Sequence, residues 1–205
     1  MASAVPAYST KELSARTWPD FEKLFSQKNG WDFCWCMHFH RCRKSPGPDK
    51  LRRAERSVRN RRDKRELVEH GRSHGILVYA DGEPVGWCQY GPSEELPRIE
   101  ESRCYRELAS ADGTKKLWRI TCFVVDKKFR RRRIASVALK TALEAIRRKG
   151  GGLVEAYPVT HFRAGTFGNQ STHGTATMFE REGFKMVAPF ARTIHRTNVL
   201  MRRTV

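Results

Sequence analysis

The sequence predicts a single α/β domain, and three observations support that prediction. Two apolar segments, 75–80 and 84–90, flank Asp81-Gly82, a pair typical of the tight turn in a β-hairpin. The apolar run 122–125 indicates the end of a strand, and the apolar residues of 134–149 recur at helical spacing. A length of 205 residues suits one domain with one core.

The N-terminal part of the domain is expected to contain two helices with a strand between them. Residues 1–9 are expected to be disordered, and the domain is expected to span 10–205. Apolar positions in 11–26 predict a short amphipathic helix, and the strict alternation of side chains in 33–40 predicts a strand. Segment 51–70 is rich in charge and in helix formers, which predicts a basic surface helix.

The elements after the hairpin follow from local patterns of apolar residues, glycine and charge. A loose acidic segment, 93–107, leads into the strand that ends at Val125, and three glycines, 150–152, end the helix that follows. The remaining elements are a buried strand over 153–159, a polar loop over 161–174, a short helix over 175–182 and closing strands over 184–190 and 196–203.

A strongly basic loop, 126–133, lies between the strand and the helix, and it contains four consecutive arginines, 130–133. The first amides of a helix lack intrahelical partners and carry positive charge, so phosphate groups bind there. Arginine adds paired, charge-assisted hydrogen bonds to the same oxygens. An isolated basic run is more often a solvated surface or a localisation signal, but its placement at a strand-to-helix turn predicts an anion-binding site.

The formal net charge of +18 favours either a nucleic acid or a small polyanionic ligand as the partner, and charge alone does not choose between them. No apolar run approaches the roughly 20 residues that cross a bilayer, and the first residues lack the apolar stretch of a signal peptide. We therefore expect a soluble cytoplasmic protein with no membrane partner. The six cysteines are scattered along the chain, which predicts reduced thiols.

Two motifs give the chain a resemblance to the GNAT superfamily of N-acetyltransferases, from about residue 10 to the end. The family's pyrophosphate loop has Arg or Gln, two residues, Gly, one residue and then Gly or Ala. Here Arg130 and Ala135 match that pattern, and Arg133 replaces the glycine. Segment 178–184 is similar to the family's short helix before a Gly-Phe strand start. Where the family has a tyrosine that protonates the leaving thiolate, this chain has Phe179.

The resemblance implies a GNAT-like single domain whose central sheet is mixed, mostly antiparallel and twisted, is flanked by helices, and splays at the acetyl-CoA site. Acetyl-CoA (coenzyme A) is therefore the implied cofactor. The backbone of Phe123, Val124 and Val125 would contact the pantetheine arm and the thioester, and Phe179 would lie against the cofactor. The residues implied at the pyrophosphate are Arg130, Arg131, Arg132, Arg133, Ile134, Ala135 and Ser136.

The resemblance also implies direct attack of a neutral amine on the thioester, without a covalent enzyme intermediate. Glu155 is the candidate base, and the alternative is a structural carboxylate with a charged partner. Tyr157, on the same strand face, is a candidate acid or else a buried aromatic residue. His173 lies near the position of the missing tyrosine and is the third candidate, with an ordinary surface histidine as the alternative.

The acceptor is expected to be a primary amine of a small molecule, with an antibiotic or another xenobiotic as one option. Carboxylates in the acceptor pocket would attract a cationic amine despite the basic composition. The residues expected to line this pocket are Trp31, Trp35, Trp87, Tyr90, Glu94 and Glu95.

One group of residues looks like a zinc ligand set, because Cys34, Cys36, His38, His40 and Cys42 fall on one face of the predicted strand. Same-face neighbours on a strand stand about 6.6 Å apart, so Cys34 and His40 would be about 20 Å apart. They could not then share one ion. We expect no metal site and interpret the segment as a wall of the acceptor pocket.

Two other functions stay open. The enzyme could acetylate a protein N-terminus or a lysine, or the chain could be a GNAT-like nucleic-acid-binding module without transfer activity. Nucleic acid is the less favoured partner, because acidic residues in segment 51–72 are spaced to pair with its arginines. The aromatic content and the closing strands make a homodimer reasonable.

Overall fold

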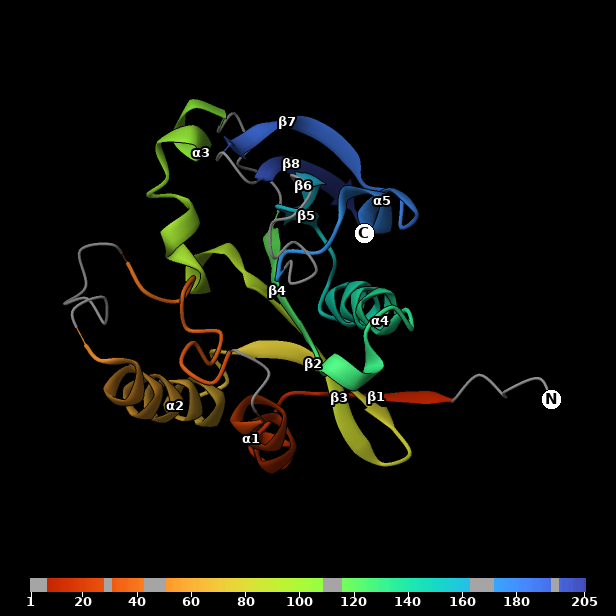
Figure 1. Ribbon diagram of the computed structural model, residues 1–205. Helices are drawn as coiled ribbons and strands as arrows, with labels where there is room; N and C mark the ends of the chain where they lie inside the picture. Colours follow the sequence, from red (N-terminus) through yellow and green to blue (C-terminus); the bar gives the residue numbers. More distant parts are fainter. Residues whose placement is uncertain (1–6, 28–30, 43–50, 109–115, 163–171, 193–195) are drawn as a thin grey trace.

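Eight strands of the described residues form one open, mixed sheet (Figure 1). The computed structural model describes residues 7–27, 31–42, 51–108, 116–162, 172–192 and 196–205. The order in the sheet is β1-β2-β3-β4-β5-β8-β6, and β7 pairs with β8. The strands are β1 (Tyr8–Glu12), β2 (His74–Ala80), β3 (Glu83–Pro92), β4 (Leu117–Val125), β5 (Leu153–Ala156), β6 (Val159–Phe162), β7 (Lys185–Arg192) and β8 (Arg196–Thr204).

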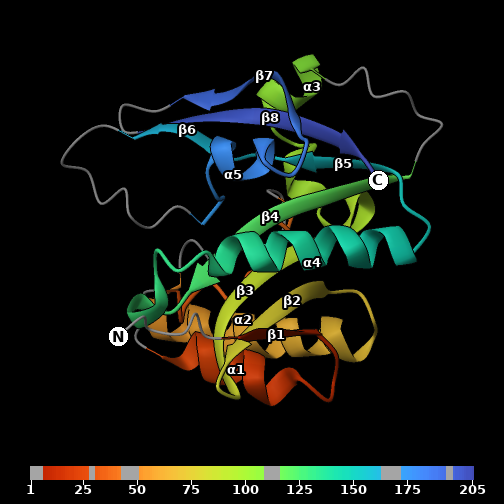
Figure 2. The same ribbon diagram turned by 90° about the vertical axis from the view of Figure 1, so that its right-hand side faces the viewer.

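Helices cover both sides of the sheet (Figures 1 and 2). Helix α4 (Ile134–Arg148) lies on one side, and α1 (Trp18–Ser26) and α2 (Arg53–Glu69) lie on the other. No helix in the described ranges combines the length and the apolar character that crossing a membrane would require. The short helices are η2 (Ser93–Glu95), η3 (Pro97–Ile99), α3 (Arg103–Leu108), η4 (Lys127–Phe129) and α5 (Ala176–Glu180).

Side chains that alternate along the central strands form two separate cores. In β2, Ile76 and Val78 belong to the core under α4, whereas Leu77 and Tyr79 belong to the core under α1 and α2. This two-sided burial explains why the strand is apolar throughout, since a strand covered on both faces has no solvent face to make polar.

The sheet opens between β4 and β5, its parallel pair. Their pairing runs only from Leu117, opposite Leu153, to Ile120, opposite Ala156, while β4 continues to Val125 on its other edge. A bulge at Thr121 marks the same point, because Ile120 and Cys122 oppose the consecutive β3 residues Tyr90 and Gln89. Bulges bend a strand and increase its twist. The predicted mixed sheet with a splayed centre is therefore confirmed.

The hairpin, α2, α4, α5 and the two closing strands lie where the sequence predicts them, within two residues at each end. The predicted strand over 153–159 is instead divided into β5 and the start of β6, with Tyr157 and Pro158 between them.

The first residues of the domain were predicted incorrectly. Residues 8–12 form an edge strand paired with β2, from Tyr8 opposite Ala80 to Glu12 opposite Ile76, where disorder to residue 9 and a helix from residue 11 were expected. The helix begins only at Trp18. Pairing with β2 supplies the hydrogen bonds of this segment, and no local pattern reveals such a partner. Residues 1–6 lie outside the described residues.

The predicted strand over 33–40 was also wrong, because this segment is a series of turns. The Met37 N–H donates to the Cys34 carbonyl at 3.0 Å, and Trp35 and Cys36 have positive φ angles of 50° and 51°. Trp35 and Met37 are buried as the alternation predicts, but Cys36 between them is buried too. Burial therefore does not alternate along the segment, and the period-two pattern of its sequence arises here without a strand.

A chain of hydrogen bonds joins the bulge of β4 to α2 through the core. The Thr121 hydroxyl donates to the Gln89 Oε1 at 3.2 Å, and the Gln89 amide donates to His40 Nε2 at 2.7 Å. The Lys64 ammonium lies 3.1 Å from the same nitrogen. His40 Nδ1 donates to the Glu95 carbonyl, so Nε2 is the acceptor of a neutral ring. Burial and the positive charge of Lys64 hold the pKa of His40 well below its usual range.

Replacing Lys64 with Met is expected to stabilise the protein at pH 7 by about 1–3 kcal/mol. Lys64 is fully buried, and burial lowers its pKa from 10.5 to about 8. The buried charge therefore costs stability below pH 8, and that cost is relieved as the pH rises towards 10.5. Urea unfolding at pH 7 and pH 9.5 measures both effects. The exposed Lys140→Met is the control, and equal shifts in the two variants would contradict the prediction.

Candidate functional site

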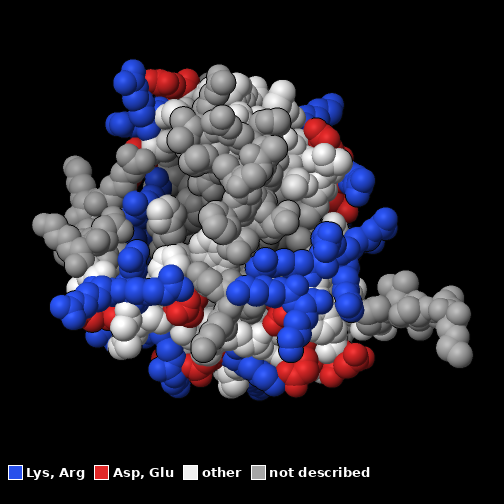
Figure 3. Space-filling model, in the orientation of Figure 1, with Lys and Arg blue, Asp and Glu red and all other residues white. Residues whose placement is uncertain are grey.

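The basic loop begins where β4 ends, at the opening of the sheet. It comprises η4, Arg130 in extended conformation and then the start of α4. Arg131, Arg132 and Arg133 are exposed and Arg130 is half-buried. Among the residues that the structure describes, no carboxylate pairs with any of these four guanidinium groups. Figure 3 shows the resulting concentration of positive charge over the beginning of α4.

Two arginines of this loop adopt backbone conformations that usually belong to glycine. Arg131 has a φ of 62°, and Arg133, the residue before α4, has φ 61° and ψ 12°. Arg133 stands where the family motif has glycine, so the loop keeps the left-handed turn without that glycine. A left-handed residue here directs the following helix amides outward, which suits an anion.

Arg133→Gly is expected to raise the free energy of unfolding by about 1 kcal/mol, because glycine adopts positive φ without a steric cost. Arg132→Gly is the matched control, since Arg132 has no positive φ, and it should lower stability by a few tenths of a kcal/mol. Thermal unfolding followed by circular dichroism measures both. A loss of stability in Arg133→Gly would refute the strain argument.

A short segment that precedes α5 lies against the edge of β4 that faces the opening. The Phe123 amide donates to the Thr172 carbonyl at 2.6 Å, and His173 Nδ1 lies 3.0 Å from the Thr121 carbonyl. A cofactor arm can use the Phe123 amide only if the Thr172 carbonyl shifts away from it. Phe179 is fully buried against Phe123, with ring centroids 6.0 Å apart, so the two rings wall the α4 side of the opening.

A cavity of about 230 Å³ lies on the opposite side of β4, under α1 and the 31–39 segment. Aromatic rings form most of its wall, and no carboxylate of the described residues lines it. His173 lies at its β4 end, where its Nδ1–H donates to the carbonyl of the bulged residue Thr121. The lining residues are Phe25, Trp31, Phe33, Cys34, Cys36, His38, Phe39, Cys122, Val124, Thr172 and His173.

The thiols of this cavity differ in acidity. Burial raises the pKa of Cys34 to about 11, and the neighbouring Cys36 adds to that shift. Burial acts in the same direction on Cys36. Hydrogen bonds with Cys122 and with the Trp87 Nε1–H, 3.2 Å away, and the charge of Lys64 outweigh it and lower the pKa of Cys36. The described residues contain no cluster of three or more ligands that could hold a metal ion.

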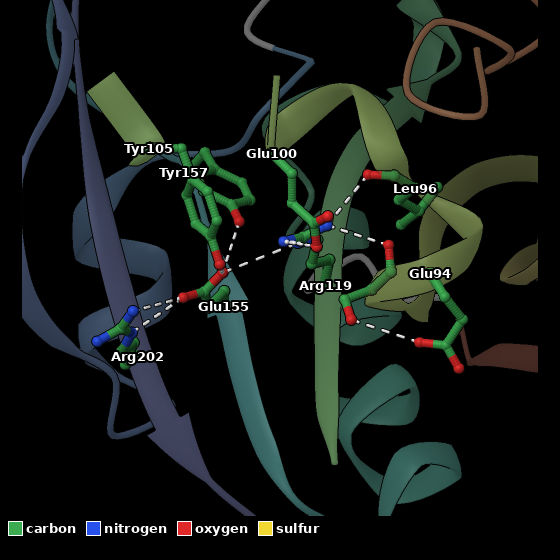
Figure 4. Close-up of polar contacts among 9 residues, drawn as sticks. Glu94, Leu96, Glu100, Tyr105, Arg119, Glu155, Tyr157 and Arg202 are labelled. Atoms are coloured by element: carbon green, nitrogen blue, oxygen red, sulfur yellow. Dashed lines mark hydrogen bonds and ion pairs between the residues drawn. The ribbon is translucent and has the colours of Figure 1, made fainter. Parts of the chain in front are cut away.

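Glu155 lies in a buried polar network rather than in the cavity (Figure 4). Its side chain is fully buried, and Arg202 donates two hydrogen bonds to its Oε1, at 2.8 and 3.0 Å. The hydroxyl groups of Tyr105 and Tyr157 donate to Oε2 at 2.9 and 2.8 Å, and the Arg119 Nε lies 3.8 Å away. These contacts occupy both carboxylate oxygens, so they favour a structural role for Glu155 over the role of a catalytic base.

Tyr157 belongs to the same buried network as Glu155, because its buried hydroxyl points at that carboxylate (Figure 4). Burial and the charge of Glu155 raise the pKa values of Tyr157 and Tyr105, so both phenols keep their protons. A phenol committed to a carboxylate is a poor proton donor for a thiolate elsewhere. The contacts of Tyr157 favour the buried aromatic alternative.

The structure brings one of the six predicted acceptor residues, Trp31, into the cavity wall. Trp35 is buried with its Nε1–H on the Ser57 hydroxyl, and Trp87 is wholly buried beside Cys36. Tyr90 points into the core under α4 and donates to Glu12.

The two predicted acidic residues lie in η2, away from the cavity. Glu95 approaches the His74 imidazole at 3.4 Å, and Glu94 accepts a hydrogen bond from Ser93. The expected carboxylate attraction for a cationic amine is therefore not present in the cavity that the structure describes.

Of the five residues interpreted as a wall of the acceptor pocket, Cys34, Cys36 and His38 line this cavity and His40 and Cys42 do not, and the segment is not a strand. Lining residues that were not assigned to the acceptor pocket are Phe33 and Phe39 in the same segment, and Phe25, Cys122, Val124 and Thr172 from other segments. The signal that was available is the density of aromatic and thiol side chains from residue 31 to 39, which exceeds what one core strand requires.

Comparisons with known proteins agree with this arrangement. A family model described as the acetyltransferase (GNAT) family matches residues 10–164. No curated protein matches the chain. The fold is similar to the N-acetyltransferase from Staphylococcus aureus Mu50, at 10% identity and TM-score 0.55, covering 97% of this chain and 98% of that one.

Two further solved structures share the fold at similarly low sequence identity. The Drosophila melanogaster polyamine N-acetyltransferase, which forms N-acetylagmatine, is 11% identical with TM-score 0.56, covering 97% of this chain and 100% of that one. The PaiA N-acetyltransferase of Thermoplasma acidophilum, solved with coenzyme A, is 10% identical with TM-score 0.50, covering 97% and 99%.

Proposed function

The chain belongs to the acetyltransferase (GNAT) family, and on that premise we propose that it transfers an acetyl group from acetyl-CoA to a primary amine of a small molecule. One observation carries the proposal. The bulged end of β4 separates a basic helix start on the α4 side from an aromatic cavity on the α1 side. A cofactor bound from one side and an amine bound from the other would meet at this strand.

The residues of the α4 start fit a pyrophosphate. The first amides of α4 have no side-chain cap, so they can donate to phosphate oxygens. The half-buried Arg130 is the best placed guanidinium to add paired hydrogen bonds, because the next three arginines extend into solvent. Ile134 is buried against β3, while Ala135 and Ser136 are half-buried at the helix start.

Bound acetyl-CoA supplies an activated thioester carbon for attack by the amine. The protein must place a neutral amine there and accept its proton. His173 is the group that we assign to this step. Its Nδ1–H donates to the Thr121 carbonyl, so the lone pair of the neutral ring resides on Nε2. It lines the cavity at the β4 end, and the aromatic wall limits access of water.

Titration calorimetry with acetyl-CoA tests the cofactor half of the proposal. Wild-type protein should bind at micromolar concentration, and Arg130→Ala should weaken binding by more than about 1 kcal/mol. Arg147→Ala, in the last turn of the same helix, removes the same charge away from the loop and should not change binding. Absence of binding in the wild type would reject the function, and equal affinities would reject the role of Arg130.

Thiol release from acetyl-CoA with a panel of primary amines tests the transfer half. The proposal also includes three more specific points. The amine belongs to an antibiotic or another xenobiotic, the protein is cytoplasmic, and it forms a homodimer. Light scattering on the purified protein checks the dimer. Acetylation of peptides but of no small amine would replace the small-molecule acceptor by a protein.

A further inference from the structure

A second, smaller cavity of about 60 Å³ adjoins the aromatic cavity. Phe33, Cys34 and His38 line both cavities and form their common wall. The smaller cavity adds arginines from three separate segments, together with one amide and one thioether. These further lining residues are Arg41, Arg56, Arg98, Asn60 and Met37.

Two of these arginines have an unsatisfied donor. The Nε atoms of Arg41 and Arg56 are buried and have no hydrogen-bond partner in the described structure. The side chain of Arg41 is only 11% exposed. Buried donors are almost always paired in folded proteins, so an orphaned pair beside one small cavity indicates a missing acceptor.

The charges around this cavity favour an anion as that acceptor. Arg41 pairs with Asp63 at 2.5 Å, and Arg59 and Arg62 contact the same carboxylate. Arg56 lies over the Phe33 ring, 5.0 Å from its centroid. No described carboxylate pairs with Arg56 or Arg98, so the cavity keeps an excess of positive charge.

The position of this cluster excludes the cofactor's phosphates as the ligand. The cavity lies on the α2 side of the sheet, whereas the arginines of the basic loop lie at the start of α4 on the other side. The arginine-lined cavity lies instead beside the aromatic cavity, where the amine is proposed to bind, and shares Phe33, Cys34 and His38 with it.

We propose that the acceptor is an aromatic or apolar amine that carries an anionic group, a carboxylate or a phosphate, bound between Arg41, Arg56 and Arg98. Its apolar body lies among the aromatic rings of the larger cavity, and its amine points to β4. This inference rests on the proposed function. It also distinguishes the chain from an enzyme for polycations, because no carboxylate in the described part of the chain lines either cavity.

Matched amines test the proposal in turnover. In wild-type protein, kcat/KM for 4-(2-aminoethyl)benzoate should exceed that for 2-phenylethylamine at least tenfold, since the two differ only in the carboxylate. Arg56→Gln and Arg98→Gln should remove that preference while leaving 2-phenylethylamine unchanged. The control Arg65→Gln, on the outer face of α2 and paired with Glu69, should keep the preference. Equal use of the two amines, with no effect of either variant, would overturn the anion subsite and leave the acetyltransferase function intact.

Binding of 4-ethylbenzoate, which has no amine, tests the subsite without turnover. Quenching of tryptophan fluorescence, with Trp31 in the larger cavity, should report binding that Arg56→Gln weakens at least tenfold. Failure of the wild type to bind 4-ethylbenzoate would also overturn the subsite. Failure to bind acetyl-CoA or to acetylate any amine, with 4-ethylbenzoate still bound, would instead overturn the function. Thermal unfolding of each variant confirms that it is folded.

Discussion

Glu155→Gln is expected to lower the free energy of unfolding by about 3–5 kcal/mol, the range for removing one partner of a buried ion pair. The change leaves the wholly buried Arg119 and the mostly buried Arg202 without their shared carboxylate. The glutamine side chain is neutral and has one oxygen in place of two. It therefore cannot accept the hydrogen bonds of both phenols and also pair with both arginines.

Urea unfolding followed by circular dichroism measures this loss. Glu107→Gln is the control, because Glu107 pairs with Arg103 on the surface, and it should cost less than about 1 kcal/mol. If Glu155→Gln were as stable as the control but turned over much more slowly, Glu155 would be the base after all.

His173→Gln is expected to lower turnover about 100- to 1,000-fold with little change in the affinity for acetyl-CoA. Glutamine can still donate to the Thr121 carbonyl, so the variant keeps the local hydrogen bond and loses the basic nitrogen. The effect belongs to kcat because a proton acceptor acts in the transition state and does not hold the cofactor.

The pH dependence of turnover separates this role from a structural one. Only the neutral imidazole accepts a proton, so the wild-type rate should fall as the pH drops and the ring takes up a proton. The remaining activity of His173→Gln should lack that limb. His70→Gln, at the end of α2 and exposed, should behave as wild type. A decrease of less than about threefold in His173→Gln would assign the proton to another acceptor.

Local signals were sufficient for most of the fold. The Asp81-Gly82 turn, the helical period after Ile134 and the glycines after α4 act within a few residues, and the elements they predict are present. The basic loop was predicted for the same reason, since its placement between a strand and a helix depends only on its immediate neighbours.

The cavity could not be predicted, because its walls come from segments far apart in the chain. Phe25 lies in the last turn of α1, Trp31 and Phe39 lie in the segment between α1 and α2, Cys122 lies in β4, and His173 lies just before α5. Sequence spacing carries no information on how such segments meet. For the same reason two of the three tryptophans expected in the pocket, Trp35 and Trp87, lie in the core instead, because core and pocket aromatics have the same composition.

The role of Glu155 illustrates a second limit. In the sequence it is a lone carboxylate on an apolar strand, which suggests function. In the sheet, β5 lies between β4 and β8, and register places Arg119 and Arg202 directly opposite Glu155 on its two neighbours. Charge compensation across strands depends on the register between them, and the sequence of one strand does not predict its register against its neighbours.

The chain of hydrogen bonds from Thr121 to Lys64 fixes the rotation of α2 about its own axis. The buried residues of this helix are Asn60, Lys64 and Val68. Only Val68 is apolar, so apolar contacts alone would not fix the rotation of the helix about its axis. Successive residues project about 100° apart around a helix, so a slip by one would swing Lys64 away from His40. The same roll would carry Arg56 out of the smaller cavity. These directional hydrogen bonds in the interior therefore also hold in place the smaller cavity, which is proposed to bind the anionic group of the acceptor.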